Sequence, residues 1–232
     1  MSMGDLDLDV TARLRGLVLG QALGDAIALP TEGLPPARIA RLFPGPLRQR
    51  LLPGGRGLGS DDTEHMVFTA QALLRHPADV AGFRGALADK LKLWLLGAPA
   101  GIGFATLRAG IKLLLGFREP GVFSAGNGPG MRAAVLGAAF PDAERRDAYV
   151  MAATRLTHTD PQALTGALAL AWAADYSVRE GRLPGWLDAS QALAGCAQPG
   201  DTAWGKLVHM IGDGLAAGED VPAFARRLGL DR

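Results

Sequence analysis

The sequence has few of the residues that would build a disulfide scaffold, a nucleic-acid-binding surface or a membrane span. Its single cysteine, Cys196, excludes an internal disulfide and is typical of a reducing cytoplasm. The 24 lysines and arginines are balanced by 23 aspartates and glutamates, so a net charge of +1 gives no bulk electrostatic reason to expect nucleic acid. The longest apolar runs, such as residues 18–29, are interrupted by glycine and aspartate and are too short to cross a bilayer. The acidic first residues lack the basic region of a signal peptide, and we expect a cytoplasmic protein with no membrane partner and no nucleic-acid partner.

Strand-like alternation is almost absent, and helical periodicity takes its place. Asp9 can cap a first helix that ends before Pro30, in which glycines at every fourth position from 16 to 24 form a stripe where another backbone can approach closely. A second helix is predicted from residue 61 or 62 to near residue 76. Further helices are expected at about 79–96, 104–115, 129–140, 143–156, 161–180, 186–195, 202–217 and 221–228. Because there is no repeat, low-complexity tract or long linker, the sequence predicts one all-α domain over residues 1–232.

Two adjacent carboxylates, Asp61 and Asp62, follow a glycine-rich turn and stand directly before an apolar run. Acids at a helix N-terminus stabilise the helix, and Asp61 with Glu64 could form a capping box, so capping alone is one explanation of the pair. Capping requires only one acid, however, and the hydroxyls of Ser60 and Thr63 add further oxygen donors. Hard divalent cations such as Mg²⁺ or Mn²⁺ prefer donors of this kind. The second explanation is therefore a metal site in an enzyme.

Three other segments carry chemistry that is less specific in isolation. Asp25 interrupts an apolar helix face, and we favour a buried acid satisfied by neighbouring backbone groups. Glu32 follows Pro30 in a loop, where it could face a cleft or remain an ordinary surface glutamate. Residues 123–132 form a glycine-rich approach to a helix, whose backbone N–H groups could hold phosphate, but they match neither a P-loop nor a dinucleotide fingerprint. His158 precedes another helix and either contacts substrate or belongs to a capping turn.

The order of these segments resembles that of the ADP-ribosylglycohydrolase family. The resemblance is carried by residues 20–26 (GQALGDA) with Pro30 and Glu32, 60–63 (SDDT), 101–106 (GIGFAT), 124–128 (SAGNG) with Met131 and Arg132, and Thr157-His158 with Pro161, Gly166 and Ala167. It implies an all-α fold with a binuclear Mg²⁺ or Mn²⁺ centre in an ADP-ribose cleft. It also implies hydrolysis of the glycosidic bond between ADP-ribose and a modified acceptor, a protein side chain or small conjugate, through an oxocarbenium-like transition state. ADP-ribose or an ADP-ribosylated protein is the partner that follows from it.

The resemblance also assigns roles to individual residues. It implies that Ser60, Asp61 and Asp62 are metal ligands, with Ser60 replacing a more usual threonine and with two ions expected if the site is complete. Asp61, Asp62 and Glu32, the acid near the scissile bond, form the catalytic set that it implies. The implied substrate-binding residues are Gly101 and Gly103 in one loop, Ser124, Gly126, Asn127, Gly128 and Met131 in a second, and His158.

One part of the family pattern is missing from the sequence. The family's other metal ligands come from a C-terminal Gly-Asp-Thr-Asp motif, whereas the nearest segment here, residues 200–203, has one acid, Asp201, which a helix-capping turn explains. We therefore expect a C-terminally short member of the family. Such a chain could be truncated, could complete its site through a second copy or a partner chain that covers the short C-terminus, or could be a pseudoenzyme that binds ADP-ribose or a partner without turnover.

Overall fold

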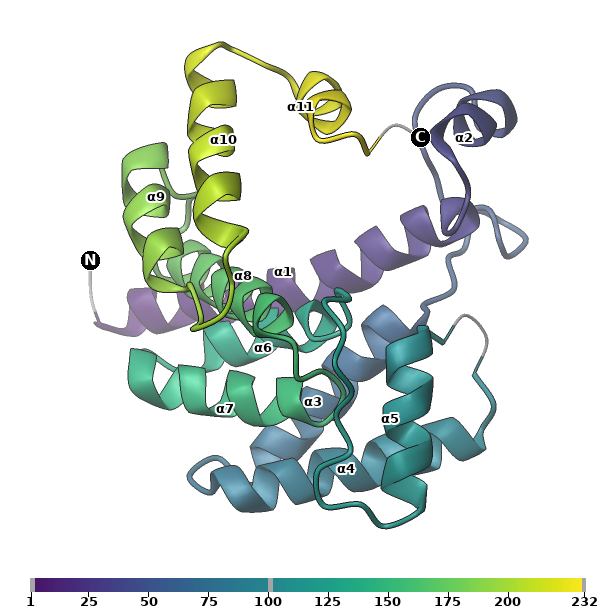
Figure 1. Ribbon diagram of the computed structural model, residues 1–232, viewed down its shortest axis with the longest axis vertical. Coiled ribbons are helices and arrows are strands. Elements are labelled where there is room, and N and C mark those ends of the chain that lie inside the picture. The colour runs from purple at the N-terminus through teal and green to yellow at the C-terminus, as the bar shows by residue number, and fades with distance from the viewer. Residues whose placement is uncertain (1–2, 100–101, 231–232) are drawn as a thin grey trace.

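Figure 1 shows the chain as a computed structural model, which describes residues 3–99 and 102–230. Within these ranges the chain forms eleven α-helices and no strand, so the all-α fold predicted from the sequence is confirmed. The helices are α1 (Met3–Ala28), α2 (Pro36–Leu42), α3 (Asp61–Arg75), α4 (Val80–Leu96), α5 (Phe104–Leu114), α6 (Gly130–Ala139), α7 (Ala143–Arg155), α8 (Pro161–Glu180), α9 (Trp186–Gly195), α10 (Trp204–Ala216) and α11 (Val221–Arg227), with a 3₁₀ turn η1 (Leu29–Thr31) after α1. That residues 1–232 form one domain stays a prediction.

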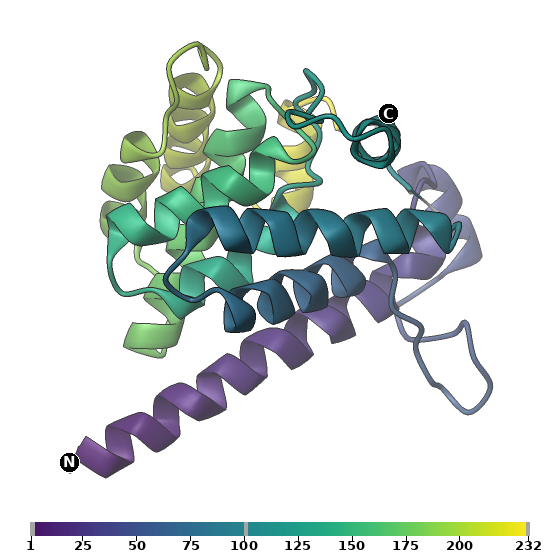
Figure 2. The ribbon, with the colours of Figure 1, turned by 90° about the horizontal axis from the view of Figure 1, so that it is seen from below.

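Helices α6 and α8 pack along each other at the centre of the molecule, and α3, α7 and α1 pack around them. Gly137 permits this close approach, because a Cβ there would lie 2.0 Å from the carbonyl oxygen of Ala171. Leu136 and Ala167 are buried beside this contact. Figure 2 shows α1 as a long diagonal helix along one side of the bundle. The first turns of α3 and α6 are joined through α1, because the side-chain amide of Gln21 donates to the backbone oxygens of Asp62 at 3.1 Å and Met131 at 2.9 Å.

A second part of the core joins α4 to α7. The ring of Tyr149 lies 4.9 Å from that of Phe83 and 4.7 Å from that of Phe140, between ring centres. Aromatic rings at such separations stabilise a core beyond the area that they bury. The Tyr149 hydroxyl donates to the backbone oxygen of His76 at 2.9 Å, so its polar atom is satisfied as well. This layer therefore ties α7 to α4 and to the end of α3.

The N-terminal part of the chain differs from expectation in three ways. Helix α1 begins at Met3 rather than after Asp9, which instead pairs with Arg13 one turn later. The glycine stripe at positions 16, 20 and 24 is open, since a Cβ there would meet no heavy atom within 4 Å beyond its own helix. The expected close backbone approach is therefore wrong for the part of the chain that the structure describes. Helix α2 was not predicted, and it begins at Pro36, where a proline costs no helical hydrogen bond.

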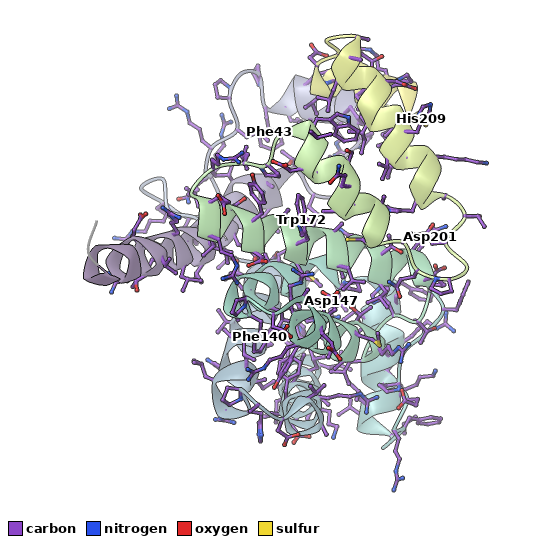
Figure 3. All side chains as sticks on the ribbon, turned by 90° about the vertical axis from the view of Figure 1, so that its left-hand side faces the viewer. Phe43, Phe140, Asp147, Trp172, Asp201 and His209 are labelled. Atoms are coloured by element: carbon purple, nitrogen blue, oxygen red, sulfur yellow. The ribbon has the colours of Figure 1, made fainter. Side chains whose placement is uncertain are left out.

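Among the C-terminal helices, α9 packs against both α8 and α10, whereas Figure 1 shows α11 apart from α8. Figure 3 shows Asp201 in the loop before α10 and His209 on that helix. Asp201 accepts hydrogen bonds from the backbone N–H groups of Ala203 at 3.1 Å and Trp204 at 3.0 Å, which confirms the capping turn. Across the ranges that the structure covers, no helix is both long enough and apolar enough to cross a membrane.

Candidate functional site

The N-terminal ends of three helices, α3, α5 and α6, meet at a cleft with a volume of about 280 Å³. Its lining residues are Glu32, Asp61, Asp62, Gly103, Phe104, Ala105, Thr106, Ser124, Gly126, Asn127, Gly128, Met131 and His158. Every catalytic and substrate-binding residue predicted from the sequence lies in this lining, except Gly101, which falls outside the described residues. Ser60 stands next to the lining, directly before Asp61. The structure thus brings together residues that are more than 120 positions apart in the chain. The roles of these residues remain predictions.

Ser60 caps helix α3, and this leaves the two aspartates free. The Ser60 hydroxyl oxygen accepts a hydrogen bond from the backbone N–H of Asp62 at 3.3 Å. The carboxylate of Glu64 accepts instead from the indole N–H of Trp94 at 2.6 Å. A capping box formed by Asp61 and Glu64 is therefore wrong, because Asp61 is already the first helical residue and the capping position falls on Ser60. Capping does not explain why two acids stand at this helix end.

The Asp25 carboxylate fastens the end of α1 to the start of α3. It accepts from the backbone N–H and hydroxyl of Ser60, both at 2.7 Å, and from the backbone N–H of Thr63 at 3.2 Å and the Thr63 hydroxyl. Burial raises the pKa of Asp25, but these four hydrogen bonds together outweigh burial and the pKa is lowered. The expected satisfied acid is confirmed, although its donors include two hydroxyls and come from a distant part of the chain.

The acids that face the cleft repel one another. Burial, followed by the charges of Asp61, Asp25 and Glu32, raises the pKa of Asp62 from its ordinary 3.8 to about 6. Burial is also the largest cause of the raised pKa values of Asp61 and Glu32, and neighbouring carboxylates add to it. Every charged group that shifts the pKa of Asp62 is negative. The cleft therefore has an acidic wall that would gain from a bound cation.

The donor chemistry of this wall suits a hard divalent cation, because Asp61 and Asp62 supply adjacent carboxylate oxygens whose repulsion such a cation would relieve. Ser60 is committed elsewhere, since its hydroxyl donates to Asp25 and only its oxygen lone pairs could serve a metal. Over residues 3–99 and 102–230, no three His, Cys, Asp or Glu side chains are grouped so as to hold a metal ion. The described residues thus fit one side of a metal site.

A second, glycine-rich wall of the cleft is formed by the loop of residues 121–130 and the turn that contains His158. These two segments are joined by backbone hydrogen bonds from Val122 N–H to the oxygen of Thr157, at 3.1 Å, and from Thr159 N–H to the oxygen of Val122, at 3.0 Å. Gly126 and Gly128 lie against the imidazole of His158, since a Cβ at Gly126 would be 3.2 Å from its Nε2 and one at Gly128 would be 2.7 Å from its Cε1. A side chain at position 128 would therefore require the imidazole to move, and one at position 126 would crowd it.

A buried polar network lies behind His158, and sequence reasoning missed it. Arg132 is fully buried on α6 and donates to the Nδ1 of His65 at 3.2 Å and to the Thr157 hydroxyl oxygen at 2.6 Å. The Thr157 hydroxyl in turn lies 2.9 Å from the Nδ1 of His158. Burial lowers the pKa of Arg132 to about 10, while burial and the Arg132 charge lower the pKa of His158 to about 4. His158 is therefore neutral at pH 7.

Phe104, Ala105 and Thr106 of the first turn of α5 also line the cleft, and they were not singled out as site residues. They follow Gly103, which precedes the helix directly. The sequence could have indicated these residues through the predicted helix start at residue 104. The first turn of a helix that follows the Gly103 loop directly lines the same cleft as that loop. Thr106 is buried, whereas the ring of Phe104 is exposed at the mouth of the cleft.

Comparison with known proteins agrees with the motifs and the geometry. An uncharacterized protein of Archaeoglobus fulgidus is 35% identical over 168 residues, which cover 68% of this chain and 53% of that protein. The uncharacterized protein YegU of Escherichia coli is 32% identical over 183 residues, which cover 70% of this chain and 53% of YegU. The chain thus spans about half the length of these curated relatives. A sequence profile of ADP-ribosylglycohydrolases matches residues 6–228. Since this match covers almost the whole chain, the protein belongs to the ADP-ribosylglycohydrolase family.

Proposed function

We propose that this chain is a metal-dependent hydrolase that cleaves the glycosidic bond between ADP-ribose and a modified acceptor. The observation that carries the proposal is the cleft with two unlike walls: carboxylates of Glu32, Asp61 and Asp62 on one side, and glycine-rich backbone with His158 on the other. ADP-ribose has matching parts, because its diphosphate is an anion and its ribose hydroxyls can bind a cation. Family membership supports this assignment of substrate.

The glycine-rich wall is suited to the diphosphate. Among the described residues, no acceptor pairs with the backbone N–H groups of Asn127 and Gly128, while that of Gly126 bonds to the hydroxyl of Ser124 at 3.2 Å. Helix α6 begins two residues beyond Gly128, and helix α5 begins beside Gly103, so two positive helix ends face the same space. Free N–H groups at helix N-termini are the usual protein donors to phosphate.

The acidic wall is suited to the reacting end of the substrate. We propose that Asp61 and Asp62, with Ser60, hold Mg²⁺ or Mn²⁺, with two ions in a complete site. A bound divalent cation would supply Lewis-acid polarisation and charge stabilisation at the ribose. Glu32 lines the same cleft, where burial and the charges of Asp61 and Asp25 raise its pKa and so favour its protonated form more than in an ordinary glutamate. We propose that Glu32 exchanges a proton with water or the leaving group.

A second function has one observation in its favour. The described residues supply no group of three potential metal-ligating side chains. A chain that kept the cleft without completing the metal site would bind ADP-ribose, or a partner, without turnover. We retain this pseudoenzyme as the alternative to hydrolysis.

Three measurements on the purified chain separate the two functions. With saturating Mg²⁺ or Mn²⁺, the hydrolase releases free ADP-ribose from an ADP-ribosylated protein or conjugate, and Asp61→Asn abolishes release. Asp89→Asn, an exposed aspartate on α4, is the matched control and should leave release unchanged. Two bound ions per chain, counted by equilibrium dialysis, would accompany an intact centre. Calorimetric binding of ADP-ribose without release on arginine-, serine- or thymidine-type conjugates at any metal concentration would reject the hydrolase and support the alternative.

A further inference from the structure

We propose that Arg132 and Thr157 form a positioning relay that holds His158 in the tautomer with its proton on Nε2, so that the ring presents a donor to the cleft. The proposal concerns the protein itself, and it rests on the proposed function only for the identity of the oxygen that accepts this hydrogen bond. Neither Arg132 nor Thr157 lines the cleft, so both act through His158.

The relay begins at Arg132, whose guanidinium can donate hydrogen bonds and cannot accept them. The Thr157 hydroxyl oxygen, 2.6 Å from a terminal nitrogen of Arg132, must therefore accept, and its own proton points elsewhere. Two acceptors lie within reach of that proton: the Nδ1 of His158 at 2.9 Å and the backbone oxygen of Thr154 at 3.5 Å. The bond at 2.9 Å has an ordinary length, whereas 3.5 Å is at the limit. The shorter distance favours Nδ1 as the acceptor of the Thr157 proton, which places the proton of the neutral His158 ring on Nε2.

His65 fixes the other end of the guanidinium. Because Arg132 donates to the Nδ1 of His65 at 3.2 Å, that nitrogen carries no proton and the proton of the His65 ring is on Nε2. The imidazole stands edge-on to the indole of Trp94, with ring centres 4.5 Å apart and planes at 76°. This edge-to-face contact and the two hydrogen bonds hold the guanidinium in one orientation, so the direction of its bond to Thr157 is set.

Among the described residues, no carboxylate hydrogen-bonds to Arg132, so an ion pair does not explain its burial. Arg132 is completely buried, yet its hydrogen bonds in the described structure go to a neutral histidine and a hydroxyl, with no carboxylate. Burying a charge without an ion pair is costly, and we infer that this charge serves to orient Thr157 and His158. Here the charge also opposes protonation of His158, which keeps the imidazole neutral and makes the tautomer the property that matters.

The Nε2 edge of His158 faces the glycine loop. The Cβ positions of Gly126 and Gly128 approach Nε2 and Cε1 of the ring, and all three residues line the cleft. A proton on Nε2 therefore adds a side-chain donor to the backbone N–H groups of the same wall. In the proposed hydrolase, its partner is an oxygen atom of the ADP-ribose diphosphate or ribose.

The tautomer can be read from long-range ¹H–¹⁵N correlation spectra of histidine side chains in the free protein at about pH 7. We expect His158 to show the Nε2-protonated pattern in the wild type and in Thr157→Ser, which keeps the hydroxyl. Thr157→Val should shift the ring towards a tautomer mixture. Thr69→Val is the matched control, since Thr69 is equally buried and its hydroxyl donates only to the backbone oxygen of His65 at 2.7 Å, so the substitution leaves the His65 imidazole and its bond to Arg132 in place. A wild-type spectrum with the proton on Nδ1 would overturn the relay, even if Thr157→Val failed to fold.

Calorimetric titration with ADP-ribose gives a second readout. Thr157→Val should weaken binding about tenfold, as expected for one misdirected hydrogen bond, whereas Thr157→Ser and Thr69→Val should bind like the wild type. An unchanged His158 spectrum in folded Thr157→Val would also overturn the relay. If the spectra behave as expected but no protein binds ADP-ribose, the relay stands and the proposed substrate is wrong.

Discussion

Replacement of Asp62 by asparagine tests whether the carboxylates of the acidic wall repel one another and destabilise the protein when no cation is bound. Asp62 is the second residue of α3 and lines the cleft, and the backbone N–H that bonds Ser60 is unaffected by the change. The substitution keeps the shape of the side chain and removes one charge from a cluster of like charges. In the absence of divalent cations, we expect the variant to be more stable than the wild type near neutral pH.

The size of the effect follows from the pKa of Asp62, which is raised from 3.8 to about 6. At about 1.4 kcal/mol per pH unit, the folded state disfavours the ionised carboxylate by about 3 kcal/mol. Asp62 is only partly buried, and solvent screening reduces this to roughly 1.5 kcal/mol. Loss of an acid from the first turn of a helix costs about 0.5 kcal/mol in return. The net expectation is a gain of about 1 kcal/mol at about pH 8.

The sign of the pH dependence follows from the same shift. Because the folded protein binds the Asp62 proton more tightly than the unfolded chain, the contribution of Asp62 to wild-type stability should fall as pH rises through the window from 3.8 to about 6 and stay lower above it. In the Asp62→Asn variant this fall should be smaller. Below the window the two proteins should differ little.

Urea unfolding at about pH 3 and about pH 8, with EDTA present, measures both predictions. Glu144→Gln is the control, because Glu144 is an exposed acid in the first turn of α7, away from the cleft. It should lose a few tenths of a kcal/mol and gain nothing. Added Mg²⁺ should raise the stability of the wild type more than that of Asp62→Asn. If Asp62→Asn is no more stable than the wild type at about pH 8 in EDTA, the repulsion argument is refuted.

Three further predictions test other parts of the structure. Asp25→Ala removes the acceptor of four donors and should lower the free energy of unfolding by about 2–4 kcal/mol at about pH 7. Because the pKa of Asp25 is lowered in the folded protein, this loss should become smaller as pH falls below 3.8. Equal losses in urea unfolding at about pH 7 and about pH 3 would contradict the prediction. Gly128→Ala places a Cβ 2.7 Å from His158 and should weaken ADP-ribose binding about tenfold by calorimetry, whereas Gly16→Ala, which meets open space, should not. The thiol of Cys196 is buried and its pKa is raised to about 11, so a thiol reagent should label it only after unfolding.

Much of the helical frame could be predicted because periodic patterns and capping residues are local. Helix α8, for example, begins at Pro161 and ends before Gly181, as proline and glycine at its two ends indicate. Helix α2 was missed because it is short, buries no residue and lies among prolines. The start of α1 was misplaced because Asp9 has the chemistry of a cap, yet the helix runs through it. In both cases the local sequence pattern was not enough to fix where the helix begins and ends.

The cleft could be anticipated only in part for a similar reason. The acids and the glycine loop stand in short motifs, so their positions were visible in the sequence. Arg132 was visible as the residue after Met131, but nothing local indicates that it lies fully buried between His65 and Thr157. Those partners come from 67 residues before it and 25 residues after it. A network of single residues from two helices and a turn has no periodicity, and it becomes apparent only when the helices are packed.

The contact between His158 and the two glycines has a consequence for sequence variation. Gly126 and Gly128 fit because they lack side chains, and the imidazole fits because nothing else occupies that space. Positions 126, 128 and 158 therefore share one volume, and a larger residue at one of them must be matched by a smaller residue at another. Among relatives of this chain we expect the three positions to covary, with a side chain at 126 or 128 accompanied by the loss of the ring at 158.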